Sequence, residues 1–250
     1  MDEHDLIQPF GETLYDEGIE EITKDIAEIA IDDLSSMVFE GVSETFLRLP
    51  IIKWAVSIGK FGWSVRNAVA LRNQLTFIQS LKNNTPNPDE IEKRCVAFRK
   101  REKWIIKEIE TSVIYLERYT NTKKAQYQAK IYCSLVNGEI SFSQYEEYLS
   151  ILDQIFLIDV EHFLDIVDYY ARNNKSFYDQ SCIRDTATHF NPVQCRRLES
   201  LGLIQGLITT RTGISTVDRY EPTEQGYHLY SVFREENDTH HAKISLSSIR

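Results

Sequence analysis

The stretch that decides the fold of the C-terminal region is 191–227, NPVQCRRLESLGLIQGLITTRTGISTVDRYEPTEQGY. Asn191 is a favoured N-cap residue, and Pro192 suits the first helical position because its missing N–H needs no partner there. The stretch therefore predicts a helix that begins at Pro192 and ends near the glycine of LGL. Two strand-like runs, 204–210 and 215–220, are separated by Arg-Thr-Gly and predict a β-hairpin.

Helices are predicted on both sides of this helix and hairpin. A short helix is expected at 182–189, and Thr223 is expected to cap a final helix that runs to about Phe233. We place this small α+β domain at 173–236 and a flexible tail at 237–250.

The predicted order of elements resembles the winged-helix domain, a helix-turn-helix fold common in bacterial regulators. The resemblance is carried by RLESLGLI at 197–204 and YEPTEQGY at 220–227, which flank the hairpin. Winged helices bind DNA or other proteins, so the resemblance implies a macromolecular partner. For DNA, it implies groove-facing residues on the second helix and one residue on the wing: Asn191, Gln194, Arg196, Arg197 and Arg211.

The charge of this region bears on the kind of partner. Residues 176–234 contain six arginines and six acidic residues, so their formal charge is zero. Phosphate contacts dominate the affinity of proteins for DNA, and a neutral domain begins without that attraction. The sequence leaves both a DNA partner and a protein partner open.

Residues 1–172 are expected to form a helical domain of five or six helices. Only 10 of the 250 residues are Gly and 6 are Pro, too few for the turns of an all-β chain. Apolar residues recur at spacings of three and four, and Ser143 with Glu146 fits a capping box. The predicted fold class is mainly α, a multi-helix domain followed by the small α+β domain.

The helical region also resembles uncharacterised bacterial proteins from prophage and phage-defence neighbourhoods. The resemblance lies in Leu49-Pro50 with the apolar residues after it, and in Ile151-Leu152-Asp153. It implies a role in phage biology.

Charge is unevenly distributed along the chain. The formal charge is −13 in 1–46, +10 in 47–130 and −7 in 131–250. Either the acidic start folds onto the basic middle, within or between subunits, or the basic middle faces an anionic partner. One long helix is predicted from about 89 to 119, and its outer face carries Trp104 among seven cations: Lys93, Arg94, Arg99, Lys100, Arg101, Lys103 and Lys107.

The most apolar stretch, 47–71, is expected to lie within one helix that runs from Pro50 to about 81. Lysines and an arginine interrupt it, which argues against a membrane span. The stretch predicts either a buried core helix or an amphipathic helix that engages lipid. In the second case, the membrane-binding or partner-binding residues are Lys53, Trp54, Lys60, Trp63 and Arg66.

The sequence contains no P-loop, G-x-G-x-x-G, H-E-x-x-H or G-x-S-x-G motif, and its four cysteines form no C-x-x-C pair. His162 lies within one turn of Asp165, where a solvated polar face is the simplest interpretation. The acidic start lacks the features of a secretory signal. We expect no catalytic residues, metal, cofactor or small-molecule substrate, and a cytoplasmic location, either free or peripheral to the membrane.

The leading hypothesis is a non-enzymatic bacterial regulatory or interaction protein. Its helical domain would form a homo-oligomer or sense a signal, and its winged helix would contact DNA or a protein. The alternative is a membrane-active effector, in phage defence or superinfection exclusion, that uses the apolar helix at 50–71.

Overall fold

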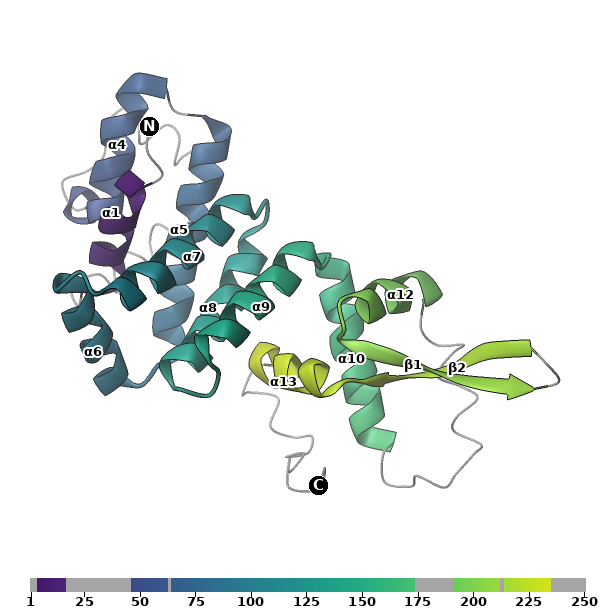
Figure 1. Ribbon diagram of the computed structural model, residues 1–250. Coiled ribbons are helices and arrows are strands. Elements are labelled where there is room, and N and C mark those ends of the chain that lie inside the picture. The colour runs from purple at the N-terminus through teal and green to yellow at the C-terminus, as the bar shows by residue number, and fades with distance from the viewer. Residues whose placement is uncertain (1–3, 17–45, 63, 174–190, 212–213, 235–250) are drawn as a thin grey trace. The chain divides into compact units, whose positions relative to one another are not determined.

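The computed structural model describes residues 4–16, 46–62, 64–173, 191–211 and 214–234 (Figure 1). These residues form ten α-helices, one short 3₁₀ helix and one two-stranded antiparallel sheet. The predicted fold class, mainly α, is confirmed at this level. The chain divides into two compact units, Met1–Asp153 and Gln154–Arg250.

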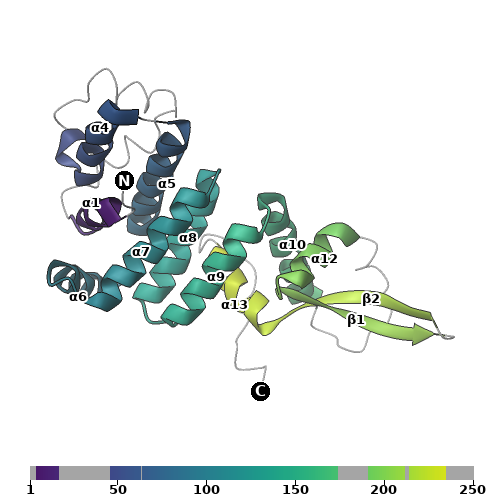
Figure 2. The same ribbon diagram turned by 45° about the horizontal axis from the view of Figure 1, so that its top comes forward.

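The first unit is helical throughout its described residues. α5 packs against α7 and α8, and α1 packs against α4 and α7 (Figures 1 and 2). Its elements are α1 (His4–Leu14), η2 (Phe46–Arg48), α4 (Pro50–Gly62), α5 (Val65–Asn83), α6 (Pro88–Arg99), α7 (Lys103–Arg118), α8 (Thr122–Val136) and α9 (Phe142–Gln154), the last ending one residue past the division.

A row of aromatic rings runs through the core of this unit. The ring of Phe77 lies 5.9 Å from that of Phe10 and 5.6 Å from that of Tyr132, which lies 5.7 Å from Tyr145. All four side chains are fully buried. These contacts join α1, α5, α8 and α9. Each of these helices also carries polar side chains, so the buried rings are what they share.

The single helix predicted from Pro50 to about 81 is wrong, because α4 ends at Gly62 and α5 begins at Val65. Ser64 has an extended backbone, and its hydroxyl accepts a hydrogen bond from the backbone N–H of Asn67. This N-cap starts a new helix, so the apolar stretch at 50–71 does not form one continuous face.

The single helix predicted from about 89 to 119 is also wrong. α6 ends at Arg99, and Arg101 has a left-handed backbone with φ of 54°. The N–H of Arg101 donates to Phe98 O, at 2.9 Å, and that of Glu102 donates to Ala97 O, at 3.0 Å. These two bonds form a Schellman ending, which turns the chain before α7.

The second unit contains α10 (Leu157–Asn173), α12 (Pro192–Ser200), strands β1 (Ile204–Arg211) and β2 (Ile214–Pro222), and α13 (Glu224–Phe233). The predicted helix, hairpin and final helix are confirmed. The strands pair from Ile204 opposite Pro222 to Arg211 opposite Ile214, with a bulge after Leu207. The helix predicted at 182–189 and the tail at 237–250 lie outside the described residues.

The unit boundary differs from the predicted one between 172 and 173. The division lies between Asp153 and Gln154, so α10 belongs to the second unit. The reason is packing, since α10 contacts α12, α13 and β2. Its side chains Phe163 and Val167 are buried, as are Leu198 and Leu229 of its neighbours.

Candidate functional site

α12 is the element on which most of the predicted partner-binding residues lie. Asn191 caps it, with its side-chain oxygen accepting from the N–H of Val193 at 2.9 Å, as the sequence predicts. Cys195 and Leu198 are fully buried on its inner side. The helix is therefore held by its cap and by two buried side chains.

An ion pair to α10 holds the same helix. The Arg197 Nε and Nη2 atoms donate to the two carboxylate oxygens of Asp159, each at 2.6 Å. Asp159 is only 1% exposed. The hydrogen bonds from Arg197, and a further one from the Gln194 side chain, hold the pKa of Asp159 below its usual range. The Arg197 guanidinium also lies 5.2 Å from the ring centre of Phe156.

The structure thus gives different roles and places to the five residues that were predicted to bind DNA. Asn191 serves as a cap, while Arg197 and Gln194 bond to Asp159. Arg196 is exposed on α12. Arg211 is the last residue of β1, about 23 Å along the strand from Ile204 at a rise of about 3.3 Å per residue, so it is not brought to α12.

Three exposed apolar side chains were missed by the sequence analysis. Val193 is 60% exposed on α12, and Phe156 and Ile158, at the start of α10, are 61% and 64% exposed. Val193 lies one turn from Arg197, and Arg197 covers Phe156, so Val193 and Phe156 flank the ion pair. We call Val193, Arg196, Arg197 and Phe156 the α12 face. The signal was the unbroken apolar run 155–158, which spans the break between α9 and α10 and in which only Ile155 is buried.

A thiol and an imidazole meet in the same unit without forming a nucleophilic pair. Cys195 Sγ lies 3.9 Å from His162 Nε2. Burial raises the pKa of the Cys195 thiol to about 11 and lowers that of His162, so both groups are neutral at pH 7. No group of three or more metal-ligating side chains that could hold a metal ion occurs within the described residues.

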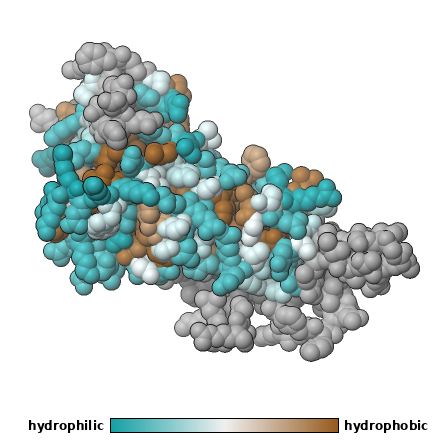
Figure 3. Space-filling view, in the orientation of Figure 1, coloured by the Kyte–Doolittle hydropathy of each residue, from teal (hydrophilic) through white to brown (hydrophobic). Residues whose placement is uncertain are grey.

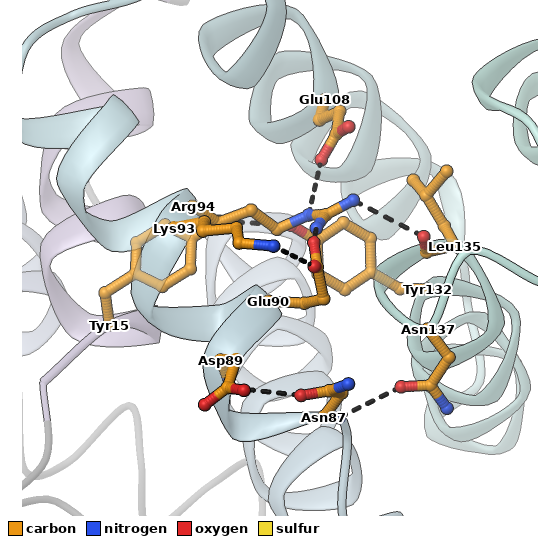
Figure 4. Close-up of polar contacts among 10 residues, drawn as sticks. All are labelled: Tyr15, Asn87, Asp89, Glu90, Lys93, Arg94, Glu108, Tyr132, Leu135 and Asn137. Atoms are coloured by element: carbon orange, nitrogen blue, oxygen red, sulfur yellow. Dashed lines mark hydrogen bonds and ion pairs between the residues drawn. The ribbon is translucent and has the colours of Figure 1, made fainter.

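In the first unit, the predicted basic surface on 89–119 is divided. Arg94 is buried, and its Nε donates to Glu108 Oε2 at 3.2 Å while a second nitrogen donates to Leu135 O (Figure 4). Lys93 pairs with Glu90. Lys107 pairs with Glu146 on α9 at 3.3 Å. Arg99, Lys100, Arg101 and Lys103 stay exposed around the turn after α6.

Figure 4 shows two tyrosines beside the buried members of this network, Arg94 and Glu108. Tyr15 and Tyr132 share a hydrogen bond of 3.1 Å between their hydroxyls, beside the buried Arg94 and Glu108. Burial raises the pKa of Glu108, against the opposing effect of Arg94. The network joins α6, α7 and α8 to Tyr15, the residue that follows α1, and its role is structural.

The acidic start that was expected to cover the basic middle lies mostly at 17–45, outside the described residues, so this contact remains a prediction. In the apolar stretch, Ile51, Ile52 and Ala55 are buried in α4, which contacts α1.

The residues predicted to engage a membrane or a partner do not share one helix. Lys53 and Arg66 are exposed on α4 and α5, and Trp54 is half-buried. Lys60 lies in α4 with a side chain outside the described set, and Trp63 is outside it altogether. Within the described ranges, no helix has the length and hydropathy needed to cross a bilayer.

The Asp159–Arg197 pair predicts a specific acid response. Because the folded pKa of Asp159 is lowered, its contribution to stability is present above its unfolded value of about 3.9 and is lost as pH falls through the folded pKa. Asp159→Asn should therefore speed amide exchange in α12 at pH 7, and the difference from wild type should shrink below about pH 4.

Hydrogen exchange measured peptide by peptide checks this prediction. Asp165→Asn, at an exposed position on the same helix, is the matched control and should leave α12 unchanged. Equal effects of both substitutions would contradict the assignment.

Comparison of the chain with protein-family models, with curated proteins and with solved structures finds no match. Inference about function consequently depends on the geometry of the two units.

Proposed function

We propose that this chain is a non-enzymatic regulatory or interaction protein whose second unit is a winged-helix module that binds a protein partner through the α12 face. Support for the winged helix comes from the order of elements: α10, then α12, then a hairpin that begins four residues after α12, then α13. The hairpin would be the wing, and α12 the helix that meets the partner.

The observation that favours a protein partner over DNA is the state of Arg197. Two nitrogens of Arg197 donate to Asp159, whose side chain is only 1% exposed. Releasing Arg197 to a phosphate would leave this buried carboxylate without its countercharge, with only the neutral Gln194 side chain bonded to it. The rest of the α12 face is apolar apart from Arg196. Exposed apolar side chains beside a fixed arginine are typical of protein-binding surfaces.

Site-specific photocrosslinking tests the proposal. A photoreactive residue placed at Val193 of the full chain, in cells of the native host, should give a protein adduct that survives nuclease and is lost when Phe156→Asp is added. The same group at Val65, which is 74% exposed in the first unit, is the matched control and should not give that adduct. No adduct at position 193, or one that nuclease removes, would overturn the proposal.

A DNA partner makes a different prediction about Arg196. If α12 bound DNA, Arg196→Ala would weaken the shift of duplex DNA by the full chain and flatten its salt dependence, because Arg196 is the exposed cation of the α12 face. We expect no shift at low salt for the wild type or for Arg196→Ala. A shift that depends on Arg196 would replace the protein partner with DNA.

A further inference from the structure

The exposed side of α6 carries opposite charges at its two ends. Asp89 and Glu92 are exposed near its start, and Lys100 and Arg101 are exposed just past its end. The helix dipole favours this polarity by itself, so the charges alone do not indicate a partner.

Between the charged ends lies a groove whose lining combines three apolar side chains with four charged ones. Its volume is about 490 Å³, and Val96 and Trp104, on its lining, are 41% and 44% exposed. Trp104 is fixed from two sides, since its indole N–H donates to Glu102 at 2.7 Å and the Arg94 guanidinium lies 5.7 Å from its ring centre. The lining comprises Asp89, Glu92, Lys93, Val96, Ala97, Glu102 and Trp104.

The groove lies where another molecule can reach it. Both ribbon views place α6 at the outer edge of the first unit (Figures 1 and 2). In the space-filling view, hydrophilic side chains cover most of the face over this part of the unit (Figure 3). A fixed indole and a valine exposed in such surroundings form a small apolar centre within a charged rim, the usual anatomy of an interface.

We propose that the occupant of this groove is a second copy of the chain, with the two α6 helices packed antiparallel about a two-fold axis near Val96. This apolar centre and charge complementarity across the axis together support the arrangement. The like charges that the axis also brings together are Lys93 and Arg99, and Lys93 is already paired with Glu90. Glu92 and Lys100 are equally spaced from Val96 along the chain, about 6 Å on either side at 1.5 Å per residue. A two-fold axis at Val96 therefore places Glu92 of each copy opposite Lys100 of the other, and it does so twice.

The apolar groups complete the contact. Val96 and Trp104 of each copy meet near the axis, where their exposed surface is covered by the same groups of the other copy. A single helix pair buries less than the standard interface of about 1,600 Å², so we expect a dimer in the micromolar range. This dimer supplies the homo-oligomer that the sequence analysis predicts, and it is independent of what the α12 face binds.

Charge-swapped variants of the full chain test the proposal by sedimentation velocity over a range of concentrations. The wild type should show a monomer–dimer equilibrium. Glu92→Lys places two lysines opposite each other, and Lys100→Glu places two glutamates opposite each other, so each should raise the dimer dissociation constant at least about tenfold. An equimolar mixture of the two variants should form a heterodimer, because both contacts then join opposite charges.

Two controls separate this contact from a general effect of charge or folding. Glu139→Lys changes an exposed acid after α8, outside the groove, and should leave the equilibrium unchanged. Circular dichroism of each variant reports its folding. A wild type that stays monomeric, variants that still dimerise, or a mixture that fails to form the heterodimer would each overturn the proposal, whatever crosslinking at Val193 reveals.

Discussion

Replacing Arg94 with alanine should lower the free energy of unfolding of the first unit by about 3–5 kcal/mol, the range typical of breaking a buried ion pair. The side chains of Arg94 and Glu108 are 9% and 7% exposed, and their atoms are 3.2 Å apart. Without Arg94, the Glu108 carboxylate stays in the core with no countercharge and the carbonyl of Leu135 loses a donor. Urea unfolding followed by circular dichroism measures the loss.

The design of this experiment separates the ion pair from general effects of truncation. Arg99→Ala removes an exposed arginine from the end of the same helix and should change stability by less than about 0.5 kcal/mol. The double variant Arg94→Met/Glu108→Leu removes both charges and should recover most of the lost stability. A loss below about 1 kcal/mol in Arg94→Ala would show that water reaches Glu108 and that the pair is not part of the core.

The pH dependence of Arg94→Ala has a definite sign. Burial already raises the pKa of Glu108 above its unfolded value, and removing Arg94 takes away the main opposing effect. A group whose folded pKa is raised costs stability when it is ionised, so protonation relieves the cost as pH falls. The stability difference between the variant and wild type should therefore shrink between pH 7 and about pH 4.

Most helices of this protein could be predicted from periodicity, but α1 and two of the breaks between helices could not. The described part of 1–173 contains eight α-helices, where five or six were expected. The turn at Lys100-Arg101-Glu102 contains neither Gly nor Pro, and apolar residues continue at helical spacing on both sides. A left-handed backbone at Arg101 costs about 1–2 kcal/mol, which the two Schellman hydrogen bonds and the packing of α6 offset. Tertiary packing determines where such a break occurs, so the local sequence contains no signal that predicts it.

Two nearby serines compete to cap α9. Ser143 and Glu146 fit a capping box, but the helix uses Ser141, whose N–H donates to the Gln144 side chain at 2.9 Å. The Ser141 hydroxyl in turn accepts from the N–H of Gln144. Both serines satisfy the pattern, and the structure places Ser141 at the helix start, directly before Phe142.

The candidate site was less predictable than the fold because it depends on distant pairs. Asp159 and Arg197 are 38 positions apart, and in the sequence Asp159 fits a helix cap while Arg197 fits a groove-facing residue. Only the contact in the structure shows that the Asp159 carboxylate and the Arg197 guanidinium neutralise each other's charge. Phe156 of the α12 face belongs to the same contact, because the Arg197 guanidinium that bonds to Asp159 also lies over its ring.

The hairpin and the last helix are joined by a contact that leaves no room for a side chain at Gly226. A Cβ added there would lie 2.0 Å from the backbone oxygen of Leu203, which cannot move without shifting the start of β1. The same oxygen accepts the N–H of Thr223 at 3.1 Å, and the Thr223 hydroxyl caps α13 by accepting from Gly226 N–H at 2.9 Å. Gly226, the glycine of TEQG at 223–226, thus allows α13 to begin against Leu203.

Gly226→Ala should therefore destabilise the second unit at the upper end of the range of about 1–3 kcal/mol for overpacking, although alanine is favoured over glycine inside helices by about 1 kcal/mol. Ser231→Ala, at an exposed position of the same helix, is the matched control and should be nearly neutral. Hydrogen exchange should show faster exchange in α13 and β1 of Gly226→Ala, with the first unit unchanged. If the substitution instead stabilised α13, helix propensity would outweigh the contact with Leu203, and the close approach could not be what fixes glycine at this position.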